Sequence, residues 1–145
     1  QATGNRQQAT GNRQQATGNR VNRVDAPEIR SHRDLIVWQK AMDLVVDVYR
    51  LSAAFPSNEQ FRLVAQVTRA SASVPANIAE GYSRSSTRDY AHFLAIAKGS
   101  LMEAETFLML AVRLGYLTAD AAAPVLDLVT ELSKMLTVLR KRLLD

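Results

Sequence analysis

From Asp34 to Leu144 the apolar residues recur at helical spacing, and no segment shows the alternation of a strand. The pattern divides into four segments, over about residues 34–54, 57–80, 86–114 and 118–144. The connections between these segments are short. Four long helices joined in this way favour an antiparallel up-down-up-down four-helix bundle. The fold is therefore predicted to be all-α.

Local signals predict where some of these helices begin and end. Ser57 followed by Gln60 has the spacing of a capping box at the start of the second helix. Pro75 lies inside the same helical pattern, where it removes a backbone donor, so we expect it to kink or split the helix. Gly81 is expected to stop the second helix in a left-handed conformation, and Gly115 is expected to stop the third.

The first predicted helix is apolar around an unusually wide arc. Its polar residues gather within roughly 100° of the circumference, so apolar side chains cover about 220°, twice the usual stripe. One bundle core does not cover so wide a face, so a second layer or another subunit must. We therefore predict a homo-oligomer whose interface includes five residues of this helix: Val37, Trp38, Leu44, Val48 and Leu51.

The chain of 145 residues has a net charge of +4, all of which lies in its first 33 residues. This opening segment repeats Gln-Ala-Thr-Gly-Asn-Arg-Gln every seven residues without a sizeable apolar side chain, which excludes a coiled coil. Its polarity favours a solvated tail, and a basic arm that contacts RNA or a neighbouring subunit is the alternative. We divide the chain into a repeat tail and linker, residues 1–32, and a four-helix domain, residues 33–145.

Residue types that carry catalysis or bind metals are scarce. The chain has no cysteine, which excludes disulfides, thiolate zinc sites and cysteine nucleophiles, and its only histidines are His32 and His92. No glutamate is followed by a histidine three residues later, as di-iron bundles require, and no glycine-rich phosphate loop occurs. No apolar run is long enough to span a membrane. We expect a cytoplasmic protein without enzymatic activity, metal or cofactor.

Glu103 is the residue of the third helix that most needs a partner. It shares its side of the helix with apolar residues, and a buried carboxylate is costly unless it is paired. Arg62, Arg69, Asn77 or a neighbouring subunit can supply the partner. We predict a structural polar network that includes Asn77 and Glu103, with a ligand site as the alternative.

Two sets of arginines are candidates for contacts with nucleic acid. Arg62 and Arg69 lie on one stripe of the second helix, and Arg84 and Arg88 flank hydroxyl side chains at the start of the third. A helix N-terminus with arginines beside it suits phosphate. The alternatives are a solvated helix face for the first pair and an ordinary N-cap loop for the second. In a ring of subunits these weak contacts would recur and add.

Three stretches carry a resemblance to a known family: DLIVWQKA from Asp34, SVPANIAEG from Ser73 and FLAIAKGSLMEAET from Phe93. Together they resemble the bacterial four-helix-bundle family encoded in intervening sequences of large-subunit ribosomal RNA genes. The accessory variability protein of diversity-generating retroelements is similar. The resemblance implies a homopentameric barrel of four-helix bundles with an RNA-associating surface, and a reverse transcriptase as a possible protein partner. It assigns six motif positions to folding and assembly: Trp38, Asn77, Glu80, Gly81, Gly99 and Glu103.

The sequence thus predicts a non-enzymatic, homo-oligomeric four-helix-bundle protein that serves as an RNA-associated accessory or assembly factor. The alternative is a self-assembling scaffold that binds a protein partner and no nucleic acid. The two hypotheses differ in what salt does, because only contacts with phosphate weaken steeply as the salt concentration rises.

Overall fold

The computed structural model describes residues 28–145, so most of the predicted repeat tail lies outside the described residues. Within this range the chain forms four α-helices and two 3-10 turns, and no strand. The α-helices are α1 (Ile36–Ser52), α2 (Leu63–Tyr82), α3 (Thr87–Arg113) and α4 (Ala119–Leu144). The turn η1 (His32–Asp34) precedes α1, and η2 (Ser57–Glu59) lies between α1 and α2. The all-α prediction is confirmed.

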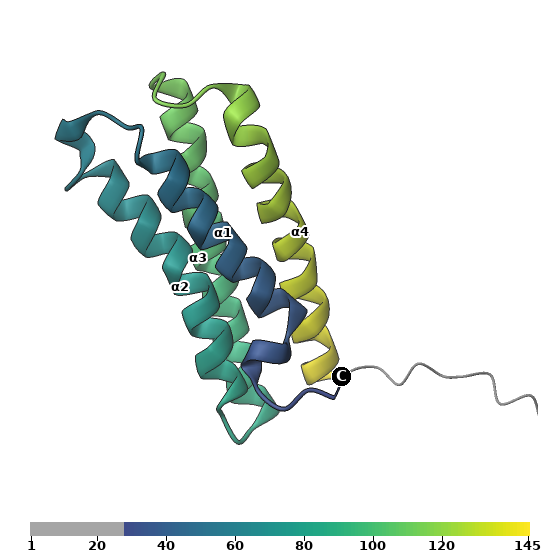
Figure 1. Cartoon of the computed structure of the whole chain (residues 1–145). Helices are drawn as coiled ribbons and strands as arrows, with labels where there is room; N and C mark the ends of the chain where they lie inside the picture. The colour runs from purple at the N-terminus through teal and green to yellow at the C-terminus, as the bar shows by residue number, and fades with distance from the viewer. Residues whose placement is uncertain (1–27) are drawn as a thin grey trace, which may run out of the picture.

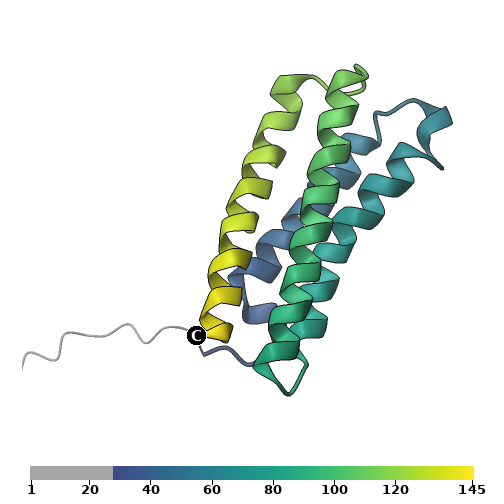
Figure 2. The same ribbon diagram turned by 180° about the vertical axis from the view of Figure 1, so that it is seen from behind.

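Successive helices run in opposite directions and form a four-helix bundle (Figures 1 and 2). α1 packs against α2 and α4, α3 packs against the same two helices, and the α2–α3 contact is the most extensive. The α2–α3 connection lies at the end of the bundle where α4 finishes (Figure 1). Among residues 28–145, no helix is both long and apolar enough to cross a membrane. The predicted pentameric barrel stays a prediction.

The core stripe of α3 has a regular heptad pattern. Leu94, Leu101 and Leu108 are fully buried at intervals of seven residues. Alanines lie three residues after each leucine, at positions 97, 104 and 111, and these are fully buried too. Small side chains beside the leucines let α2 and α4 approach α3 closely. In one copy of the chain α3 also keeps exposed apolar residues, Ile96, Met109 and Leu110, and Leu114 directly after its end is exposed as well.

The two apolar sides of α1 have different surroundings from those predicted. Val37, Leu44 and Val48 are buried in the core of the single chain, so they are not free to form an interface between copies. Trp38 and Leu51 are half-buried and pack against the edge of that core. Four large apolar residues of α1 are exposed instead: Met42, Val46 and Tyr49 on the side opposite the core, and Ile36 in the first turn among the polar residues.

The start of α2 differs from the predicted capping box. Ser57 begins the short turn η2, and α2 begins only at Leu63. The cap comes from Glu59, whose Oε2 accepts a hydrogen bond of 3.2 Å from the backbone N–H of Leu63. Glu59 is almost fully buried, and its Oε1 accepts a second hydrogen bond, of 3.2 Å, from the hydroxyl of Tyr116. A buried carboxylate with these two donors organises the α1–α2 connection.

The proline and glycines of the helices also show where local rules are overridden. α2 runs without interruption through Pro75 and through Gly81, so the predicted split and the predicted left-handed stop are both wrong. A Cβ on Gly81 would lie 2.8 Å from Cβ of Phe93 and 3.1 Å from Cδ1 of Tyr90. This glycine therefore serves the close packing of α2 on α3. Gly115 does end α3 in the left-handed region, with φ of 77°.

Candidate nucleic-acid interface

The two arginines predicted on α2 each lie beside a carboxylate. Nη2 of Arg69 lies 2.8 Å from Oε1 of Glu103 on α3 and also donates to Gln66 at 3.1 Å. Nη1 of Arg62 lies 3.8 Å from the carboxylate of Glu59. A phosphate that approached either arginine would have to compete with a carboxylate already in place.

The two arginines around the α2–α3 connection have different surroundings. Arg84 is paired with Glu80 one turn earlier, and its guanidinium lies over the ring of Phe93, 4.7 Å from the centroid. The stacking holds Arg84 against the protein. Arg88, in the first turn of α3, is exposed and forms no ion pair within residues 28–145. Of the four predicted arginines, only Arg88 is therefore free of a carboxylate among the described residues.

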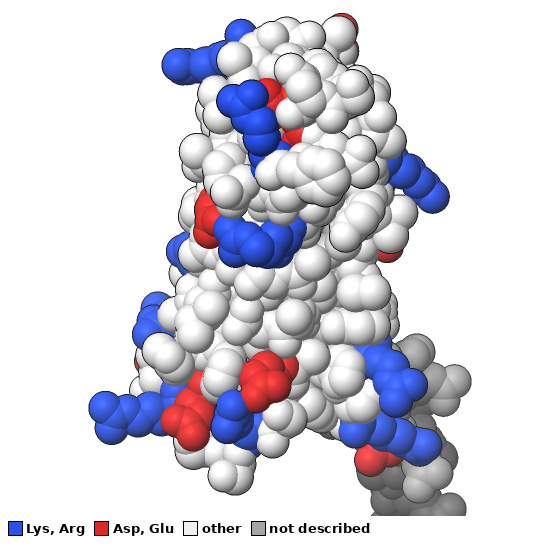
Figure 3. Space-filling model, turned by 90° about the vertical axis from the view of Figure 1, so that its left-hand side faces the viewer, with Lys and Arg blue, Asp and Glu red and all other residues white. Residues whose placement is uncertain are grey.

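Figure 3 shows this side of the molecule, which α2 forms. Basic and acidic side chains lie next to one another on a surface that is otherwise largely uncharged. Paired charges at this degree of exposure contribute little to stability, typically about 0.2 to 1 kcal/mol each. They do cancel the positive potential that would attract a polyanion. The solvated-face alternative therefore describes Arg62 and Arg69 better than a phosphate contact does.

The predicted polar network of Asn77 and Glu103 is divided in two. Nδ2 of Asn77 donates to the backbone oxygen and the hydroxyl of Ser73, at 2.8 Å and 2.9 Å. The hydroxyls of Ser73 on α2 and Ser100 on α3 lie 2.8 Å apart. Glu103 pairs with Arg69 instead and does not take part in these hydrogen bonds. Both parts connect α2 to α3, which gives them a structural role in the helix pair.

The aromatic residues beside the α2–α3 connection form a compact corner. The rings of Tyr82 and Tyr90 meet edge to face, with centroids 6.1 Å apart. Burial raises the pKa of the Tyr90 hydroxyl above its usual value, and the nearby Tyr82 raises it further. Tyr90 is therefore uncharged at neutral pH. The contact between Tyr82 and Tyr90 joins the end of α2 to the start of α3, on either side of the loop that carries Arg84.

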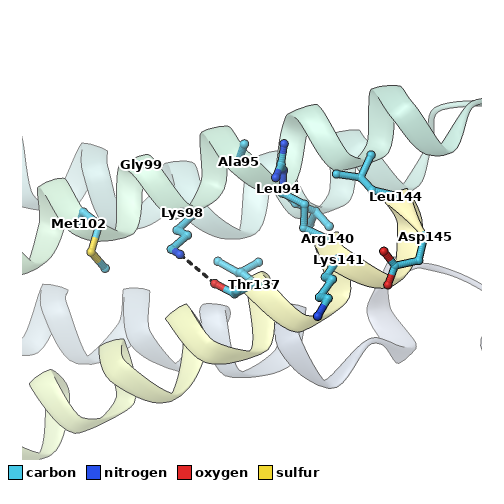
Figure 4. A pocket seen from close by; sticks show the side chains of 11 residues that line it. Leu94, Ala95, Lys98, Gly99, Met102, Thr137, Arg140, Lys141, Leu144 and Asp145 are labelled. Atoms are coloured by element: carbon cyan, nitrogen blue, oxygen red, sulfur yellow. Dashed lines mark hydrogen bonds between the residues drawn. The ribbon is translucent and has the colours of Figure 1, made fainter.

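A groove between α3 and α4 was not predicted from the sequence. It encloses a cavity of about 610 Å³ beside the C-terminal turns of α4 (Figure 4). Leu94, Met102, Leu136 and Leu144 provide its apolar lining, and Lys98, Arg140, Lys141 and Asp145 provide its charges. We call this site the α3–α4 groove. The three consecutive cations from Arg140 to Arg142 were the sequence signal for this groove. Cations in the last turn of a helix are equally well explained by the helix dipole, so the signal was not specific.

The three cations of the groove differ from the arginines of α2. Nζ of Lys98 donates to the hydroxyl of Thr137 at 2.8 Å, and Nε of Arg140 donates to the backbone oxygen of Ala91 at 3.2 Å. Within residues 28–145, Lys98, Arg140 and Lys141 have no carboxylate within 4.0 Å, the limit for an ion pair. Neutral partners position Lys98 and Arg140 without cancelling their charge.

The charge of the bundle is also unequal along its length. We divide the helices at their midpoints into a basic half (residues 28–44, 73–100 and 131–145) and an acidic half (residues 45–72 and 101–130). The basic half has ten Lys and Arg against seven Asp and Glu, whereas the acidic half has four against six. The groove lies in the basic half, and the arginine-containing residues 1–27 join the bundle there, at Glu28.

Features of metal or catalytic sites are sparse in the described part of the chain. Residues 28–145 contain no cluster of three or more His, Asp and Glu side chains that could hold a metal ion. His92 is exposed beside Phe93, and His32 contacts Trp38 edge to face, with ring centroids 5.1 Å apart.

Comparison with known proteins decides the family. Residues 33–138 match the model of the 23S rRNA-intervening sequence protein family. The chain belongs to this family. Three cations of the basic half, Arg140, Lys141 and Arg142, follow the last residue that the family model matches.

A solved structure supports this membership. A protein with unknown function from the S23 ribosomal protein family of Bacteroides thetaiotaomicron is 27% identical, with a TM-score of 0.66. The alignment covers 73% of this chain and 99% of that protein. No curated protein matches the chain significantly.

Proposed function

We propose that this family member is a non-enzymatic, RNA-associated accessory factor that contacts RNA phosphates through its basic half. The observation that carries the proposal is the charge state of the α3–α4 groove. Lys98, Arg140 and Lys141 line it without carboxylate partners among the described residues, in the half of the bundle with excess positive charge. Binding of phosphate to such cations is favoured by the release of counterions. A family named for intervening sequences of 23S rRNA supports RNA as the partner.

We further propose that the protein acts as a cytoplasmic homo-oligomer, with a pentamer as the expected form. The exposed apolar residues of α1, among them Ile36, Val46 and Tyr49, support association, because they have no cover in the single chain. Several grooves in one particle would bind an extended RNA much more tightly than one groove does. A protein partner such as a reverse transcriptase would then meet an assembled particle.

A self-assembling scaffold is the second candidate. A second cavity, also of about 610 Å³, lies between the start of α1 and the end of α4, and Ile29, Ile36 and Val138 are exposed around it. Such an apolar surface suits a protein partner better than a polyanion. In this alternative the protein binds no nucleic acid.

The test compares two triple charge reversals of the full chain. One changes Lys98, Arg140 and Lys141 to Glu, and the matched control changes Arg50, Arg62 and Arg69, all in the acidic half, to Glu. Affinity for a fluorescein-labelled single-stranded RNA is measured by anisotropy at several salt concentrations, and circular dichroism checks that each variant is folded. The slope of log affinity against log salt should fall by about 2 in the groove variant, because roughly 0.7 is lost per phosphate contact.

The control variant should retain most of the wild-type slope. Loss of binding in the control alone would move the interface to the acidic half and contradict the assignment of the groove. A wild-type protein that shows no salt-dependent RNA binding would contradict the RNA proposal and leave the scaffold.

A further inference from the structure

Gly99 is the one glycine of residues 28–145 that the fold does not explain. Gly81 is required by the close approach of Phe93, and Gly115 by its positive φ. A Cβ on Gly99 would have no atom within 4 Å, and the residue is exposed in the middle of the 27-residue helix α3. Glycine at such a position weakens a helix without any benefit to packing inside the chain.

Gly99 is one of the residues that line the α3–α4 groove. It lines the groove between Ala95 and Met102, so α3 presents bare backbone where a side chain would otherwise stand (Figure 4). Lys98 is the preceding residue, and Figure 4 shows its side chain directed toward Thr137 across the groove. The surface is therefore open and apolar at its lining, and its charged residues are three cations and Asp145.

Three features of the groove restrict its occupant. The unpaired cations suit an anionic group, and the half-buried Met102 with the exposed backbone of Gly99 suits a flat or apolar group beside it. The cavity of about 610 Å³ is in the range of sites that hold one small molecule. A nucleotide with an unstacked base has these properties, whereas a duplex keeps its base faces stacked inside the helix.

We propose that the α3–α4 groove takes one unpaired nucleotide of the RNA, with its base against the backbone of Gly99 and the side chain of Met102. A thioether makes favourable contacts with aromatic rings, which suits Met102 for this place. The adjoining phosphates contact Lys98 and Arg140, whose neutral hydrogen bonds leave their charge available. This inference rests on the proposed function and specifies its ligand as single-stranded RNA.

The experiment fills the groove without harming the fold. Gly99→Leu places a side chain in open space and replaces glycine by a good helix former, so the melting temperature of the full-length protein should not fall. The matched control is Ala76→Leu, which adds a leucine at an exposed position of α2 outside the groove. The probes are a single-stranded RNA of roughly ten nucleotides and a duplex of the same length.

Gly99→Leu should weaken binding of the single strand by roughly tenfold or more, the usual effect of losing one stacked base. It should leave duplex binding unchanged, and Ala76→Leu should bind both probes like the wild type. Wild-type affinity of Gly99→Leu for the single strand would overturn the inference, and so would an equal loss for strand and duplex. The proposed function would survive either result if the groove charge reversal still weakens binding and lowers the salt slope. A wild-type protein that binds neither probe would overturn both.

Discussion

Gly81 and Gly99 lie inside helices and have opposite surroundings, so they predict opposite effects of the same substitution. Gly81→Ala should lower the free energy of unfolding by about 1 to 2 kcal/mol, because its Cβ meets the main-chain-anchored Cβ of Phe93 at 2.8 Å. Gly99→Ala should raise the same free energy by about 1 kcal/mol, because its Cβ meets nothing and the helix gains propensity. Urea unfolding of the two variants measures both. Effects of the same sign would contradict the packing of α2 on α3 described above.

The carboxyl group of Asp34 predicts that the stability of the fold depends on pH. Its Oδ2 accepts hydrogen bonds from the backbone N–H groups of Arg30 (2.9 Å) and Ser31 (3.2 Å), and these lower the pKa of the carboxyl below its usual 3.8. A folded-state pKa below the unfolded value stabilises the fold above pH 3.8, and this contribution disappears as the pH falls through the folded value.

Asp34→Asn should therefore have a lower urea midpoint than the wild type at pH 7, and the two midpoints should converge in strong acid. The fluorescence of the single tryptophan reports the transition locally, because Trp38 contacts His32 of the turn that Asp34 closes. A difference that stays constant down to pH 2 would show that the charge of Asp34 is not its cause.

At the scale of the helices, the two sides of α1 predict a separation of stability from assembly. Leu44→Ala should cost about 2 to 5 kcal/mol of unfolding free energy, because Leu44 is fully buried in the single chain. Val46→Glu, on the exposed side, should leave the unfolding free energy nearly unchanged and lower the particle mass measured by light scattering. A wild-type protein that is already a monomer at high concentration would contradict the assembly proposal.

The sequence predicts the four helices well because their signals are repeated many times. Each helix has several apolar residues at helical spacing, and one misleading residue does not change the pattern. The inward side of α1 could not be predicted, because both sides of its arc are apolar and only packing against α2 and α4 distinguishes Val48 from Val46. The role of Gly81 was missed for a similar reason, since its neighbour Phe93 lies twelve residues away on another helix.

The candidate site was less predictable than the fold. Ion pairs between helices decide which cations are free, and sequence spacing shows only the pairs within one helix. Arg69 is neutralised by Glu103 from α3, whereas Lys98 meets a hydroxyl of α4. Arg69 is one of several partners that the sequence allows for Glu103, and only the packing of α2 on α3 selects it.

At the scale of the whole molecule, the excess positive charge predicts where RNA affinity resides. A shortened chain that begins at Glu28 loses the four arginines of residues 1–27 and keeps the basic half of the bundle. The loss of RNA affinity should be largest at low salt. At high salt the arginines of the removed segment are already screened and contribute little to binding. It should keep the difference between single-stranded and duplex RNA, since the α3–α4 groove is intact. Affinity measured at two salt concentrations tests this, and loss of that difference would assign discrimination to residues 1–27.

The unequal halves also give the bundle a permanent electric dipole along its long axis. In the field of a polyanion such a molecule turns before it touches, so that the end of α4 leads and the η2 end trails. Productive encounters then form a larger share of all collisions, and the association rate rises while the dissociation rate is left to the local contacts. Added electrolyte should therefore slow the arrival of the protein on RNA before it shortens the time that the protein stays there.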